Sequence, residues 1–216
     1  MKPTTAQLQP ADLRQQAAGE ADGSPTTAQR LRRLAWVGLN ATGAQLGWFG
    51  CVVCAAQGRP AWGIGLALML VALHTATAPR PAAEARLIGA VLIVGMAWDS
   101  LLAMTGVVEY RGNGWLPGLA PFWIGALWAL FAATLNHSMR WLRDRRLAAV
   151  VFGAIAGPMS FWAGVRLGAA RLPNAPMALA VLSIGWAVLL PALVQLAARL
   201  DPTSRLASKP ADQSDA

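Results

Sequence analysis

The chain has 216 residues, of which 56% are hydrophobic and only 13% charged, and its formal net charge is +8. Soluble domains carry about 25% charged residues, so this composition excludes an ordinary water-soluble globular domain. The basic residues lie beside apolar stretches and not among aromatic residues of a soluble segment. This argues against nucleic-acid binding and favours contact with anionic lipid headgroups.

The chain begins and ends with a polar tail. Residues 1–29 are rich in Ala, Gln, Thr, Pro and Gly and contain few large apolar side chains, so we expect a disordered cytoplasmic tail. Residues 200–216 have a similar composition and are expected to form a second disordered tail. Between them, residues 30–199 form the predicted transmembrane domain.

The middle of the chain contains six apolar segments. A membrane-spanning helix needs about 20 mostly apolar residues. The segments that meet this requirement are 34–56, 62–78, 87–108, 119–139, 147–168 and 176–198. We therefore expect an all-α polytopic membrane protein, a bundle of about six transmembrane helices, in which Glu84, Glu109 and Asp144 fall in loops.

The basic residues predict the direction in which these helices cross. Short loops on the cytoplasmic side carry an excess of Lys and Arg. With six spans both tails lie on one side, and of the 18 Lys and Arg residues only Arg59, Arg111, Arg166 and Arg171 fall on the other side. We expect both termini to be cytoplasmic.

Small residues recur along one face of several spans, and polar side chains share that face. Helices in lipid pack closely through small residues, whereas a polar group aimed at acyl chains would stay unpaired. We therefore expect a bundle with an interior polar seam. By depth along the helices, its members are Asn40, His74, Asn136, His137 and Ser138 in the cytoplasmic half, Gln45, Asp99 and Ser160 near the middle, and Arg166 near the outer end.

Asp99 is the first candidate for a functional residue. An ionisable group near the bilayer centre costs about 2.5–3.5 kcal/mol on insertion scales and usually marks a functional site. The alternative is a hydrogen-bonded Asp that holds helices together. Arg166 is a candidate counter-charge for Asp99, although it lies nearer the outer surface.

The two histidines suggest chemistry less specifically. His74 and the run 136–138 could combine with Asp99 in a metal site or a nucleophilic triad. The spacing matches neither an H-E-x-x-H nor a G-x-S-x-G motif, and Asp99 lies at another depth. We therefore predict no metal and no cofactor, and we expect the histidines to form hydrogen bonds or headgroup contacts.

Cys51 and Cys54 form a C-x-x-C pair near the outer end of the first span. Such a pair signals thiol redox chemistry in a βαβ context, which this chain lacks. We interpret the two cysteines as small packing residues.

Five tryptophans fall near the middle of the predicted spans, and two interpretations stand. They either fill space beside small residues or form the wall of an aromatic cavity, and each buried indole N–H favours a hydrogen-bond partner. These residues are Trp48, Trp98, Trp128, Trp162 and Trp186.

Several blocks of sequence, in a specific order, resemble a known family. The blocks lie at 40–49 (NATGAQLGWF), 98–100 (WDS), 116–117 (LP), 127–142 and 153–169. They are similar to the DUF2878-like family of small bacterial inner-membrane proteins, and the similarity extends over roughly residues 35–198. The family has no established activity, and its members are often encoded near enzymes that modify membrane fatty acids. The resemblance implies a multi-pass protein of the bacterial inner (cytoplasmic) membrane in a lipid-related setting.

Three functional hypotheses follow. The first is an accessory component of membrane-lipid modification or handling, with membrane lipids and a lipid-modifying enzyme as partners and no nucleic acid. The second is a small secondary transporter or exporter that uses Asp99 as its coupling group. The third is an intramembrane enzyme that uses His74 and His137. The sequence does not set the oligomeric state.

Overall fold

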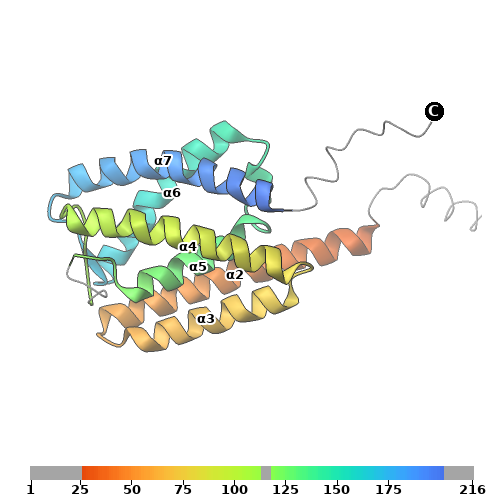
Figure 1. Ribbon diagram of the computed structural model, residues 1–216, viewed down its shortest axis with the longest axis horizontal. Coiled ribbons are helices and arrows are strands. Elements are labelled where there is room, and N and C mark those ends of the chain that lie inside the picture. The colour runs from red at the N-terminus through yellow and green to blue at the C-terminus, as the bar shows by residue number, and fades with distance from the viewer. Residues whose placement is uncertain (1–25, 113–117, 202–216) are drawn as a thin grey trace, which may run out of the picture. The chain divides into compact units, whose positions relative to one another are not determined.

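A computed structural model describes residues 26–112 and 118–201, and within them the chain is mostly helical (Figure 1). Most of the two predicted tails lies outside these residues. The elements, in chain order, are α2 (Thr27–Ala56), α3 (Pro60–Thr77), α4 (Pro81–Met104), β1 (Glu109–Tyr110), α5 (Phe122–Leu135), the 3-10 helix η1 (Arg140–Leu142), α6 (Arg146–Arg166), β2 (Ala170–Arg171) and α7 (Ala175–Leu200).

The chain divides into two units, Met1–Val37 and Gly38–Ala216. In the described part of the first unit, Thr26 and Gln29 form a reciprocal cap at the start of α2. The Thr26 backbone N–H donates to Gln29 Oε1 at 2.9 Å, and the Gln29 N–H donates to Thr26 Oγ1 at 3.3 Å. This pair satisfies two backbone donors that a helix start leaves open. All further contacts described below lie in the second unit.

Proline and glycine fix several helix ends. Pro60 and Pro81 lie at the start of α3 and α4, where a missing backbone N–H is harmless and the fixed φ suits a helix. Gly106 and Gly168 follow the ends of α4 and α6 with φ of +68° and +85°. That left-handed backbone is cheap for glycine and closes a helix in the usual way.

Four helices are long and apolar enough to cross a membrane: α3, α4, α6 and α7. α5 is apolar but has only 14 residues, and α2 is long but carries Asn40, Thr42 and Gln45 within its apolar stretch. Large apolar side chains also lie on outward faces, among them Ile93 and Ile184, which are each 69% exposed. These features are those of an integral membrane protein. The count of six crossings stays a prediction.

α5 is the buried centre of the bundle. It packs against α3 and α4, while α6 packs against α7 (Figure 1). Trp128 of α5 stacks on Trp186 of α7, with ring centroids 5.3 Å apart and planes 2° apart. Because these large rings meet glycines of neighbouring helices, as described below, they fill space between the helices.

The helices of the second unit run between two ends. At the hairpin end, which comprises residues 105–112, 118–121 and 167–174, β1 pairs antiparallel with β2 so that Glu109 faces Arg171. At the histidine end, which comprises residues 74–84, 136–146 and Asp201, α3 turns into α4, α5 has ended, α6 begins and α7 ends. α5 begins at the hairpin end, where Trp123 Nε1 donates to Arg111 O at 2.9 Å.

Some predicted boundaries differ from the structure. The third predicted span, 87–108, is shifted because Pro81 starts α4 and the turn at Gly106 ends it. Glu84 therefore lies in the first turn of α4, and its placement in a loop was wrong. The fourth predicted span, 119–139, extends beyond α5 at both ends because Pro121 precedes the helix and the polar run from Asn136 forms a turn.

Candidate functional site

Two histidines and a glutamate meet at the histidine end, and we call them the His–Glu cluster. His74 lies in the last turn of α3, Glu84 in the first turn of α4, and His137 in the turn after α5. His74 Nε2 is 3.6 Å from Glu84 Oε2, and His137 Nε2 is 3.7 Å from Glu84 Oε1. The imidazole rings meet edge to face with centroids 4.9 Å apart. The short α3–α4 connection and the end of α5 thus bring three metal-binding residue types together.

Hydrogen bonds from polar neighbours hold the cluster in place. Asn136 Nδ2 donates to Glu84 Oε1 at 2.8 Å. Asn40 Nδ2 lies 3.3 Å from His74 Nδ1, and Ser138 Oγ donates to Asn40 Oδ1 at 2.7 Å. The cluster is therefore surrounded by amides and a hydroxyl that fix the orientation of its side chains.

Arg143 connects this network to α7. Its Nη2 donates to Asn136 Oδ1 at 2.5 Å, and its Nη1 forms an ion pair with Asp201 Oδ2 at 2.9 Å. The side chains of Arg143 and Asp201 are only 10% and 17% exposed. Because Arg143 pairs directly with Asp201 and reaches Glu84 only through Asn136, the Glu84 carboxylate faces imidazoles and not a guanidinium.

Asp99 occupies a separate site between α4, α5 and β1. It is 2% exposed. Tyr110 Oη donates to its Oδ1, and Trp128 Nε1 donates to its Oδ2 at 2.5 Å. Burial and the nearby Asp99 carboxylate raise the pKa of Tyr110 well above its usual value of 10.0, so the phenol stays a donor. Both carboxylate oxygens are thus satisfied by neutral donors from elements that pack against α4.

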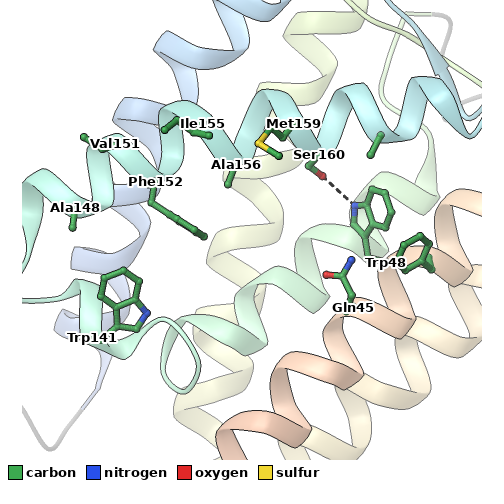
Figure 2. Close-up of a pocket in the computed structure, with 12 residues that line it drawn as sticks. Gln45, Trp48, Trp141, Ala148, Val151, Phe152, Ile155, Ala156, Met159 and Ser160 are labelled. Atoms are coloured by element: carbon green, nitrogen blue, oxygen red, sulfur yellow. Dashed lines mark hydrogen bonds between the residues drawn. The ribbon is translucent and has the colours of Figure 1, made fainter.

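An open apolar groove of about 710 Å³ lies between α2 and α6. Figure 2 shows Trp48 and Trp141 near opposite ends of a row of α6 side chains. Trp48 Nε1 donates to Ser160 Oγ at 3.2 Å across the groove. Besides the indoles, Gln45 and Ser160 are the polar side chains of the lining; the other lining residues are Phe49, Ala148, Val151, Phe152, Ile155, Ala156, Met159 and Ala163.

The groove has basic residues at one end. Trp141 lines it near the histidine end, and the Arg145 guanidinium carbon lies 6.0 Å from the Trp141 ring centroid. Arg145 and Arg146 are exposed and stand at the start of α6. The apolar groove therefore ends at cationic side chains and at the N-terminus of α6, and both favour anions.

The structure distributes the predicted seam residues over three places. Asn40, His74, Asn136, His137 and Ser138 meet at the His–Glu cluster. Gln45 and Ser160 line the groove. Asp99 lies apart from both, and Arg166 is exposed at the end of α6 while neutral donors hold Asp99.

Of the five mid-span tryptophans, Trp98, Trp128 and Trp186 pack against glycines of neighbouring helices, whereas Trp162 is 44% exposed. A Cβ on Gly95 would lie 1.9 Å from Trp128, and one on Gly185 would lie 2.3 Å from Trp98. Trp48 is different because it lines the groove. Both cysteines are free thiols. The Cys51 thiol is buried and donates to a backbone oxygen at 3.3 Å.

Sequence reasoning missed Glu84 and Arg143. Both are charged residues close to the ends of predicted spans, where charged side chains usually contact lipid headgroups and water. The available signal for Glu84 was its place one turn into a helix that starts with Pro81, ten positions after His74. Because only three residues connect α3 to α4, the last turn of α3 and the first turn of α4 lie beside each other, and His74 meets Glu84.

Comparison with known proteins identifies a family and nothing closer. The model of a family described as "Protein of unknown function (DUF2878)" matches residues 37–192. The resemblance seen in the sequence is therefore confirmed. No curated protein and no solved structure matches the chain.

Proposed function

We propose that this chain, which belongs to the DUF2878 family of proteins of unknown function, holds a phospholipid in the groove beside α6 as an accessory component of membrane-lipid handling. The supporting observation is the combination of an apolar groove with basic side chains at one end. An amphipathic lipid has the same two-part chemistry. The proposal includes the inner-membrane location and a lipid-modifying enzyme as partner.

The groove is long enough to hold one acyl chain. Its lining on α6 extends from Ala148 to Ala163, which is about 22 Å at about 1.5 Å of rise per residue. The hydrocarbon of one leaflet is about half of the roughly 30 Å core. Small side chains, such as that of Ala156, leave the groove open between Trp48 and Trp141.

The positions of the basic residues support a headgroup at the histidine end. The Arg145 guanidinium lies over Trp141, Arg146 follows it in the chain, and exposed Arg140 lies one residue before Trp141. Each basic residue close to an anionic membrane surface contributes about 1 kcal/mol. A phosphate at this end therefore receives favourable charge from several arginines while the acyl chain lies along α6.

The two alternative functions have weaker support. A coupling role for Asp99 requires it to exchange a proton or cation, but both of its oxygens accept hydrogen bonds inside the packed interface of α4 and α5. This favours a role in holding the helices together. The histidines are close enough to act together through Glu84.

The lipid proposal is tested by filling the groove. Ala156→Trp places an indole in the lining, whereas Ile184→Trp adds the same group to an exposed position on α7. We expect lipid retained through detergent purification, measured by mass spectrometry, to fall severalfold in Ala156→Trp and to be unchanged in Ile184→Trp. Equal retention in the two monodisperse variants would contradict the proposal.

The headgroup position is tested with two pairs of charge substitutions. Arg145→Gln with Arg146→Gln removes the charges at the groove, and Arg59→Gln with Arg166→Gln removes two exposed charges at the other end. At about 1 kcal/mol per residue, the first pair lowers retention of anionic lipid by about tenfold or more.

In cells, a deletion strain should show an altered acyl-chain profile that wild type restores and Ala156→Trp does not.

A further inference from the structure

The His–Glu cluster has the donor set of a transition-metal site. We propose that His74, Glu84 and His137 bind one divalent transition-metal ion, with Zn²⁺ the best match. Two imidazoles and a carboxylate are ligands that zinc takes in catalytic sites, where three protein groups leave a further position open. The cluster shares no residue with the groove, so this proposal does not depend on lipid binding.

The spacing of the ligand atoms is close to what a metal requires. One nitrogen or oxygen from each residue can be chosen so that all three lie within 4.8 Å of one another. Around a tetrahedral ion with bonds of about 2.0–2.1 Å, neighbouring ligand atoms are about 3.4 Å apart. His74 Nε2 is 3.6 Å from Glu84 Oε2 and His137 Nε2 is 3.7 Å from Glu84 Oε1, so each imidazole is within a few tenths of this value from one carboxylate oxygen. A single ion would take Glu84 through both oxygens, or through one oxygen after a rotation of the carboxylate.

The burial of the cluster calls for a cation. His74 and Glu84 are 9% and 7% exposed. Among the described residues, His74 Nε2 and Glu84 Oε2 have no hydrogen-bond partner, although they face each other. A buried polar atom without a partner costs about 1–3 kcal/mol, and buried charges are normally paired or bound to metal. One bound ion would satisfy both atoms together.

The surrounding polar groups suit a metal's outer shell. Asn136 donates to Glu84 Oε1 and is itself held by Arg143. Coordination through His74 Nε2 places the ring proton on Nδ1, next to the Asn40 amide. That amide is fixed by two further hydrogen bonds, since its Nδ2 donates to Ala133 O at 3.0 Å and its Oδ1 accepts from Ser138 Oγ. Such outer partners orient the ligands and tune affinity.

The test uses the full-length protein in detergent, purified with a tag that contains no histidine and treated with a chelator. Co²⁺ is the probe, because its visible absorption reports nitrogen and oxygen coordination, and Zn²⁺ is the competitor. We expect saturable Co²⁺ binding that Zn²⁺ displaces. Because outer-shell changes alone cost about 10–100-fold in affinity, Glu84→Gln and His137→Gln should each weaken binding by at least about 100-fold.

Control variants exclude other ligands. Glu109→Gln removes an exposed carboxylate, and Cys51→Ala with Cys54→Ala removes both thiols. Both controls should bind Co²⁺ as the wild type does, and Zn²⁺ should raise the melting temperature of the wild type but not of Glu84→Gln. The proposal is wrong if folded wild type takes up no more Co²⁺ than monodisperse Glu84→Gln and His137→Gln, or if binding is lost only with the cysteines. Unchanged Co²⁺ binding in Ala156→Trp would show that metal binding does not depend on lipid binding in the groove.

Discussion

At the scale of single residues, Asp99 shows how a buried carboxylate can be held without a cation. Its two oxygens accept from the Tyr110 hydroxyl and the Trp128 indole. Each donor belongs to a different element, so one side chain connects α4 to α5 and to β1. The raised pKa of Tyr110 keeps its proton in place over the ordinary pH range. These contacts assign Asp99 a structural role in this part of the bundle.

The stability of Asp99 variants tests this role. Asp99→Ala leaves two buried donors without an acceptor, and each such donor costs about 1–3 kcal/mol. Tyr110→Phe removes one donor and leaves the carboxylate with the other, and it keeps the stack of Trp128 on Trp186. We expect Asp99→Ala to lower the melting temperature in detergent more than Tyr110→Phe does. A melting temperature of Asp99→Ala equal to that of wild type would show that the two hydrogen bonds do not stabilise the fold.

At the scale of elements, helix packing here depends on glycines that face indole rings. Gly95 of α4 lies under Trp128, and Gly157 of α6 lies under Trp186. The two rings stack on each other, so each pair of helices meets through a ring that occupies the space a Cβ would take. In lipid, where apolar surface alone does not drive helices together, this close fit is a main source of association.

Two glycines on the same helix give a matched test. A Cβ at Gly95 would lie 1.9 Å from Trp128, whereas one at Gly89 would have no atom within 4 Å. Gly95→Ala should therefore destabilise the protein by about 1–3 kcal/mol, the usual cost of overpacking. Gly89→Ala should be neutral or stabilising by up to about 1 kcal/mol, because alanine favours the helix. Chemical unfolding in detergent measures both, and equal effects would contradict the packing described here.

The sequence predicts the helices better than it predicts the contacts between them. Apolar runs indicated which segments are helical, because apolar length is a local property, but the start of α2 at Thr27 lies seven residues before the predicted start at 34. The three-dimensional neighbours of Asp99 were not predictable in this way: Tyr110 and Trp128 reach it through a loop and another helix. Glu84 was missed because a shift of a few residues at Pro81 decides between a loop and the first turn of α4. The meeting of His74 with His137 depends on the relative heights of α3 and α5, which hydropathy does not set.

At the scale of the whole second unit, the contacts define two ends with unequal charge. The hairpin end is joined by the β1–β2 pair, Glu109 with Arg171. The histidine end carries the basic run 140–146. α5 extends between these ends although it has only 14 residues, since its start contacts the hairpin end and the turn after it contacts Glu84. An even number of crossings and a cytoplasmic position of the histidine end stay predictions from the charge rule.

Cysteine labelling tests this topology directly. In a background with Cys51→Ala and Cys54→Ala, single cysteines are introduced at exposed positions, Glu109→Cys at the hairpin end and Pro79→Cys or Asp144→Cys at the histidine end. A membrane-impermeant maleimide should label Glu109→Cys in spheroplasts and the other two only in inverted vesicles. The two histidine-end positions are the informative pair, because they precede and follow the short helix α5. Labelling of Pro79→Cys and Asp144→Cys from opposite sides would mean that α5 does not cross the membrane. The run from Asn136 would then lie at the outer surface and not in an interior polar seam.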